Sequence, residues 1–111
     1  MKREIKKYLY DISVSIASIN EYLGEKRDFN KFRESKLLKR AIEREIEIIG
    51  EAMNNILKIE PNIKIKNARK VVDTRNWVIQ GYNKVDDVII WGIVINYLPE
   101  LQKDIEYLLS I

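Results

Sequence analysis

Several side chains with useful chemistry fall between residues 75 and 82, in the segment Arg75-Asn76-Trp77-Val78-Ile79-Gln80-Gly81-Tyr82. A guanidinium can stabilise the charge of a phosphate, and amide side chains can donate and accept hydrogen bonds. An amide cannot exchange a proton near neutral pH, so Gln80 cannot act as a general base. Tyr82 offers a hydroxyl, although the same residue could simply cover a helix end with its hydroxyl in water. The segment predicts a polar, anion-binding site without a titrating base.

Basic residues are concentrated around the same segment. The chain has 20 Lys and Arg against 17 Asp and Glu, a net charge of +3. Between residues 64 and 84, however, only one acid, Asp73, accompanies Lys64, Lys66, Arg69, Lys70, Arg75 and Lys84. Such a cluster could bind a phosphate backbone, or it could be a solvated helix face that happens to be basic. Charge supports the site without establishing it.

Composition excludes several kinds of catalytic site. The chain has no cysteine and no histidine, so disulfides, thiolate and imidazole metal sites, and Ser-His or Cys-His pairs are impossible. Glu43, Glu47 and Glu51 repeat every four residues, but they fall outside the apolar stripe of their helix. We interpret them as a solvated stripe paired with Lys39 and Arg44. We therefore expect neither a metal nor a cofactor.

The elements that must position these residues are predicted to be helices. Apolar residues recur at spacings of three and four along nearly the whole chain, as in amphipathic helices. The predicted helices run from about Ile5 to Leu23 before Gly24, from about Lys36 to Ile59 before Pro61, from Ala68 to Ile79 before Gly81, and from a cap at Asp86 or Asp87 to Leu109 with a kink at Pro99.

The predicted fold is all-α, an up-and-down four-helix bundle in a single domain covering residues 1–111. Gly50 inside the second helix predicts a close approach by another helix. Phe29 and Phe32 should pin the polar connection 25–35, which could hold a short extra helical turn. The longest apolar run, 88–95, is too short for a bilayer, which takes about 20 residues. With no signal-peptide pattern at the N-terminus, we expect a cytoplasmic protein.

Four blocks of the sequence resemble the HepT-type members of the HEPN superfamily. These are the toxin halves of toxin–antitoxin pairs formed by a HEPN protein and a minimal nucleotidyltransferase. The blocks are YLYDI (8–12), EIIGEA (47–52), TRNWVIQGYNKVD (74–86) and LPEL (98–101), and the middle two are the most specific. The family signature is Arg, a polar residue, three variable residues, His, one residue and Tyr. It maps onto Arg75, Asn76, Gln80 and Tyr82, so this chain departs from it at the histidine.

The resemblance implies a metal-independent endoribonuclease that acts as a homodimer, with the motifs of two subunits meeting in a cleft. RNA supplies the 2′-hydroxyl nucleophile, so the protein needs a base to take its proton and a cation to stabilise the phosphate. The family assigns these roles to position 80 and Arg75, which lie about 140° apart around a helix and can border one groove. Loss of a general base typically costs about 10² to 10⁴ in rate. We therefore expect impaired catalysis here.

The same resemblance implies a role for Tyr82, and the chemistry of the neighbouring residues suggests roles for them. Tyr82 resembles an acceptor for AMP groups transferred by the nucleotidyltransferase antitoxin, which would silence the toxin at its RNA cleft. Asn76 could orient Arg75 or contact phosphate, and Trp77 is expected to pack against the dimer partner or a neighbouring helix rather than stack on an RNA base. Asp73 lies close enough to pair with Arg69 or Arg75 and could hold Arg75 in position. The remaining RNA-binding side chains are expected to be Arg69, Lys70 and Lys84.

Three functions from different classes fit these observations. The first is a ribonuclease toxin scaffold, active or disabled at Gln80. The second is a non-catalytic HEPN homologue that binds RNA or nucleotide, or serves as the partner of a nucleotidyltransferase. The third is a plain helical interaction domain. Gln80 itself is either a natural degeneration or a deliberate inactivation, and the retention of the neighbouring family positions favours the second origin.

Overall fold

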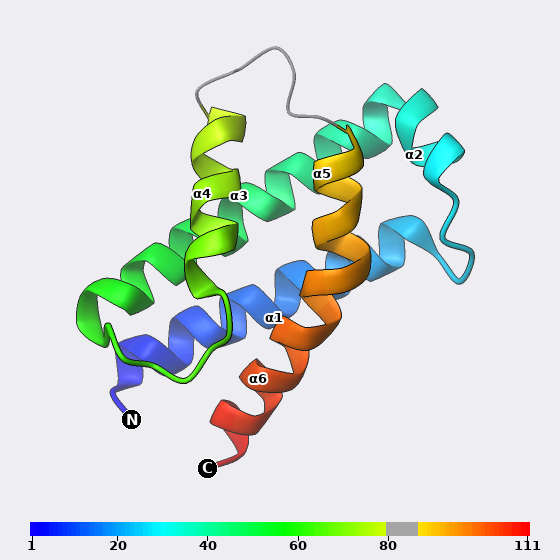
Figure 1. Cartoon of the computed structure of the whole chain (residues 1–111). Helices are drawn as coiled ribbons and strands as arrows, with labels where there is room; N and C mark the ends of the chain where they lie inside the picture. Colours follow the sequence, from blue (N-terminus) through cyan, green and yellow to red (C-terminus); the bar gives the residue numbers. More distant parts are fainter. Residues whose placement is uncertain (80–86) are drawn as a thin grey trace.

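The chain folds into an all-α structure in which a long helical hairpin is crossed by a second pair of helical segments (Figure 1). The computed structural model describes residues 1–79 and 87–111, without the side chains of Trp77 and Ile79. Its helices are α1 (Arg3–Leu23), α2 (Phe29–Glu34), α3 (Lys36–Ile59), α4 (Ala68–Ile79), α5 (Asp87–Gly92), the π-helical turn η1 (Ile93–Tyr97) and α6 (Leu98–Ser110). The all-α prediction is confirmed, and the short extra turn is α2.

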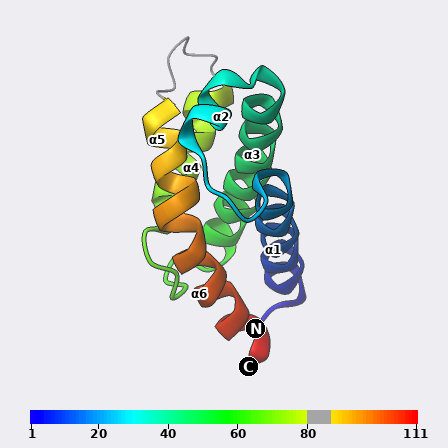
Figure 2. The same cartoon turned by 90° about the vertical axis from the view of Figure 1, so that its right-hand side faces the viewer.

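Helices α1 and α3 are antiparallel and pack along each other (Figures 1 and 2). Helix α1 ends at Leu23 because Gly24 adopts φ 69°, a conformation that is free of strain only without a Cβ. Helix α3 begins after Ser35, whose hydroxyl accepts a hydrogen bond from the Leu38 amide at 3.1 Å. Both boundaries agree with the sequence prediction.

The core lies where α1, α3, α4 and the C-terminal helices meet, and it is almost wholly aliphatic. Fully buried side chains include Ile12, Ile46, Ile49, Met53 and Leu101. Each such side chain stabilises the fold by roughly 1.5 to 3 kcal/mol relative to an exposed one. All of them belong to the stripes of three- and four-residue spacing, so the same periodicity that predicts the helices also selects the core.

An aromatic cluster holds α2 against the bundle. The ring of Phe32 is buried, and its centroid lies 5.3 Å from that of Trp91, while the Phe29 ring lies 5.8 Å from Trp91 in an edge-on arrangement. Pairs of this geometry are worth about 0.5 to 1.5 kcal/mol beyond the area they bury. The prediction that the two phenylalanines pin the connection is confirmed.

Helices α5 and α6 are joined through η1 into one helical stretch that bends on its way through the bundle (Figures 1 and 2). Pro99 has no amide hydrogen and interrupts the regular i→i−4 bonding. The amide of Leu98 bonds instead to the carbonyl of Ile93, five residues back, which is a π-type turn. The kink predicted at Pro99 is therefore accompanied by a π-helical turn just before the proline. Asp87 is the first residue of α5, and Asp86 lies outside the described residues.

The two ends of the chain lie beside each other, at the opposite end of the molecule from the C-terminal end of α4 (Figures 1 and 2). Within residues 1–79 and 87–111, no helix combines the length and the apolar character needed to cross a membrane.

Candidate functional site

Arg75 occupies the side of α4 that packs on α3, a position normally taken by an apolar residue. Val71 and Val72, one turn earlier on the same side, are buried, and Arg75 itself is half-buried. Charged side chains are rarely buried unless they are paired, because the charge loses its hydration. The location of Arg75 therefore calls for an explanation beyond packing.

Gly50 makes room for the stem of Arg75. A methyl group on Gly50 would overlap the Cβ of Arg75 and would lie 2.8 Å from its Cγ and 3.0 Å from the carbonyl oxygen of Val71. Any side chain at position 50 would therefore push α4 away from α3. The predicted close approach of another helix at Gly50 is confirmed, and the approaching residue is the arginine of the motif.

The guanidinium of Arg75 has a neutral partner. Its Nη1 donates a hydrogen bond to the Oδ1 of Asn76 at 3.0 Å, so Asn76 orients the arginine, as one of the two predicted roles requires. Its Nε is buried and has no hydrogen-bond partner among the residues the structure describes. In that part of the chain no carboxylate pairs with Arg75. Its positive charge is therefore not neutralised there and remains able to attract an anion.

The possible ion pair of Asp73 with Arg69 or Arg75 does not form among the described residues. Asp73 and Arg75 are two residues apart, and such residues face nearly opposite sides of a helix. Asp73 and Arg69 have a suitable spacing, but both are exposed. An exposed pair gains only about 0 to 1 kcal/mol and loses side-chain entropy in forming.

The two predicted RNA-binding residues at the start of α4 are exposed but face different directions. Arg69 precedes Asn76 by seven residues, so the two lie on one face of the helix. Lys70 extends toward the C-terminal helices, where its Nζ lies 6.0 Å from the centre of the Tyr97 ring. The structure thus groups Arg69 with Asn76 and separates Lys70 from them. Gln80, Tyr82 and Lys84 lie outside the described residues.

Two residues of the C-terminal helices hold the segment that leads into α4. The hydroxyl of Tyr97 donates to the carbonyl of Lys66 at 3.2 Å, and the carboxylate of Asp104 accepts from the Lys66 amide at 3.1 Å. Asn67 then adopts φ 56°, and the Lys70 amide bonds to the Asn67 carbonyl at 3.0 Å as α4 begins. Burial raises the pKa of the Tyr97 hydroxyl, and the nearby Asp104 carboxylate raises it further. The hydroxyl therefore keeps its proton and remains a hydrogen-bond donor.

The contacts of Tyr97 and Asp104 with Lys66 could not be predicted from the sequence. Tyr97 falls in an apolar stripe and reads as an ordinary core residue, and Asp104 reads as a surface acid. Their common partner, Lys66, is 31 residues from Tyr97 and 38 from Asp104. A tyrosine on a buried stripe does indicate a hydroxyl that needs a partner, but it does not say which.

The comparisons with known proteins agree with these features. Residues 12–108 match the family model described as Ribonuclease HepT-like. The chain belongs to the HepT-like ribonuclease family. It is 35% identical to "Putative RNase MJ1380" of Methanocaldococcus jannaschii, over 95% of this chain and 96% of that protein. It is also 35% identical to "Probable ribonuclease HepT" of Thermococcus cleftensis, over 97% of this chain and 98% of that protein. No solved structure matches the chain significantly.

The acidic stripe of this HepT-like chain makes ordinary surface contacts. Glu47 pairs with Arg44 at 3.3 Å, as predicted, whereas Lys39 reaches across to Asp87 of α5 at 3.5 Å. Partial burial raises the pKa of the Glu43 carboxyl, and the nearby Arg40 opposes this shift. No group of three or more potential metal-ligating side chains occurs in the described ranges 1–79 and 87–111.

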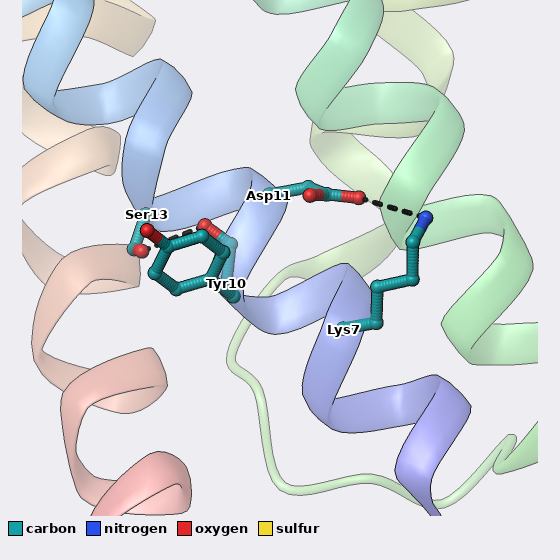
Figure 3. A network of polar contacts seen from close by, with 4 residues as sticks. All are labelled: Lys7, Tyr10, Asp11 and Ser13. Carbon is teal, nitrogen blue, oxygen red and sulfur yellow. Dashed lines mark hydrogen bonds and ion pairs between the residues drawn. The ribbon is translucent and has the colours of Figure 1, made fainter.

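The first block that resembles the HepT-like family lies on α1, and its polar contacts are also local (Figure 3). The Nζ of Lys7 lies 3.5 Å from the Oδ2 of Asp11, four residues later, and the hydroxyl of Ser13 donates to the carbonyl of Tyr10 at 2.7 Å. Each contact joins residues of the same helix and is exposed. These contacts join side chains within α1 and do not make a second candidate site.

Proposed function

We propose that this chain is the toxin of a HEPN/minimal-nucleotidyltransferase toxin–antitoxin pair, acting in the cytoplasm as a homodimer whose cleft binds RNA. Membership of the HepT-like ribonuclease family supports an RNase-type activity on an RNA substrate. The observation that carries the proposal is the state of Arg75. Arg75 is half-buried, and its guanidinium is oriented by a neutral amide and has no carboxylate partner within the described residues. Such a group can bind and stabilise the charge of a phosphate.

In the proposed reaction, the 2′-hydroxyl oxygen of a nucleotide attacks the adjacent phosphorus while the bond from phosphorus to the 5′-oxygen of the next nucleotide breaks. The hydroxyl proton must pass to a base, and the leaving oxygen must gain a proton. Arg75 stabilises the charge that develops on the phosphate. Gln80 cannot accept the proton, so this chain retains the RNA-binding side chains but cleaves slowly. Arg69, on the same face of α4 as Asn76, adds positive charge near Arg75, and Lys70 and Lys84 are proposed as further RNA-binding residues.

The central experiment restores the missing base. The substitution Gln80→His should increase the rate of RNA cleavage by about 10² to 10⁴, and the activity should survive a metal chelator because RNA supplies the nucleophile. Cleavage is measured on labelled single-stranded RNA under single-turnover conditions. Arg75→Ala in the Gln80→His background should abolish it. A correctly folded, dimeric Gln80→His protein that cleaves no RNA would contradict the toxin proposal.

Tyr82 is proposed to regulate the same cleft. The nucleotidyltransferase would join the phenolic oxygen of Tyr82 to the α-phosphorus of ATP, with pyrophosphate as the leaving group. The added phosphate charge at a basic cleft would repel RNA. Incubation with the partner transferase and ATP should increase the intact mass by whole AMP units, and Tyr82→Phe should prevent it. An unchanged mass of the wild-type chain would count against this regulation.

Gln80 also supports a second candidate, a non-catalytic homologue that binds RNA or nucleotide, or that serves only as the partner of the transferase. The cleavage experiment separates the two. If Gln80→His binds RNA with the affinity of the wild type and still does not cleave it, the non-catalytic function is the better description. If it cleaves, the chain carries an otherwise complete ribonuclease site.

A further inference from the structure

We infer that Gly50 is the positioning residue of the Arg75 site: its missing side chain lets α4 approach α3 closely enough to hold the arginine stem in place. This inference rests on the proposed role of Arg75 in binding phosphate. It gives a function to a glycine in the interior of α3, where glycine lowers helix stability because it leaves the unfolded chain more freedom.

The contacts around Gly50 leave no easy way to fit a side chain. Of the atoms that a Cβ at position 50 would meet, the Cβ of Arg75 and the carbonyl oxygen of Val71 are fixed by the backbone of α4. Only the Cγ of Arg75 could rotate away. A larger residue at position 50 must therefore move the whole helix, and the guanidinium moves with it.

The close approach restricts the arginine along its length. The first carbons of its side chain lie against α3, its Nε is buried, and its Nη1 is bonded to Asn76. A side chain held this way loses its rotamer freedom during folding rather than when ligand binds, which favours binding and correct orientation. Gly50 thus acts on the reaction through Arg75, without touching RNA.

Gly92 provides a matched control. It lies in helical backbone with φ −59° and ψ −40°, as an interior glycine of the C-terminal helical stretch. A Cβ added there would meet nothing within 4 Å. Gly92→Ala therefore removes the same backbone freedom as Gly50→Ala without forcing two helices apart.

The first measurement needs no RNA. In a ¹⁵N correlation spectrum, the Nε–H signal of Arg75 can be assigned by its disappearance in Arg75→Lys. Because the Nε is buried, its proton should exchange slowly with water in the wild type. Gly50→Ala should shift this signal or broaden it through faster exchange, and Gly92→Ala should leave it unchanged.

The second measurement uses cleavage in the Gln80→His background, at a temperature where circular dichroism shows each variant fully folded. A displacement of about 1 Å can cost about 10²-fold in rate, so Gly50→Ala should lower kcat by about that factor. The change in KM should be smaller, because Arg75 stabilises the charge that develops during the reaction in addition to binding the phosphate. Gly92→Ala should retain the parental kcat.

The outcomes separate this inference from the proposed function. Gly50→Ala could lower the melting temperature and yet have the same Nε–H signal and the same kcat as Gly92→Ala. In that case Gly50 only packs against α4, and the inference is overturned. If Gln80→His alone does not cleave RNA, the proposed function fails, while the Nε–H signal still tests the contact.

A second variant covers the case in which Gly50→Ala does not fold. The double substitution Gly50→Ala with Arg75→Gly places the glycine on α4 instead of α3. It removes the Cβ and Cγ of Arg75, the two side-chain atoms that the new methyl group would meet. This double variant should recover the helical circular dichroism and cooperative melting of the parent. If Arg75→Gly alone folds and the double variant does not, the Arg75 side chain is not what Gly50 accommodates, and the inference is overturned.

Discussion

At the scale of single residues, the hydrogen bond from Arg75 to Asn76 sets the charge of the site. Because the acceptor is an amide, it fixes the guanidinium without neutralising it. A carboxylate at the same place would form a stronger, charge-assisted bond and would compete with a phosphate for the arginine. Asparagine at position 76 therefore orients the guanidinium of Arg75 and leaves its charge available to bind a phosphate.

Competition between a carboxylate and phosphate for Arg75 predicts the effect of Asn76→Asp. The new carboxylate should weaken binding of single-stranded RNA by roughly tenfold, on the order of 1.4 kcal/mol, because it engages Arg75 and repels phosphate. Asn76→Ala should cost less, since it removes orientation but leaves the charge. Fluorescence anisotropy at a single fixed salt concentration compares the variants, because such affinities depend strongly on salt. Equal affinities for Asn76→Asp and Asn76→Ala would refute the competition.

Among single residues, some contacts follow from the sequence and others do not. The signature spacing identifies Arg75 and Asn76, and adjacency makes their contact a reasonable expectation. The possible ion pair of Asp73 does not form among the described residues, because nearness along the chain differs from nearness on a helix surface. The half-buried state of Arg75 depends on how close α3 comes, which a local pattern does not specify.

At the scale of elements, Ser35 connects two helices. Its amide bonds to the carbonyls of Lys31 and Phe32 at the end of α2, and its hydroxyl caps the start of α3. The long helix that carries Gly50 therefore begins at a defined residue. This is why the boundary at Lys36 can be predicted from sequence.

The cap predicts a stability effect without a functional one. Ser35→Ala should lower the free energy of unfolding by about 1 kcal/mol, measured by urea denaturation, and should leave RNA affinity unchanged. Ser18→Ala is a suitable control, because Ser18 lies inside α1, where its hydroxyl bonds to the carbonyl of Val14 and caps no helix end. If both substitutions have the same effect on stability, Ser35 does not act as a cap.

The C-terminal helical segment illustrates the limit of prediction for elements. Pro99 marks the position of the disturbance, because its ring and missing amide are local properties. The π turn from Ile93 to Tyr97 is not a local property. The extra residue in the turn also determines which side of the helix Tyr97 occupies, and hence whether its hydroxyl can reach Lys66.

At the scale of the whole molecule, four apolar stripes are enough to predict a helical bundle, because each stripe must be buried against another. Gly50 likewise predicts that a helix comes close. It does not predict that Arg75, 25 residues later in the numbering, is the neighbour. Such pairings depend on the crossing of α3 and α4, which follows from the packing of the full core rather than from any one segment.

The neighbouring chain ends have a practical consequence for experiments on this protein. Since the two ends lie together, and away from the C-terminal end of α4, a short linker could join them and new ends could be opened in the connection 24–28. Circular permutation is generally tolerated in such folds. A fluorophore or fused reporter attached at residue 1 or residue 111 would likewise lie away from the C-terminal end of α4, so binding could be followed with the label at a distance.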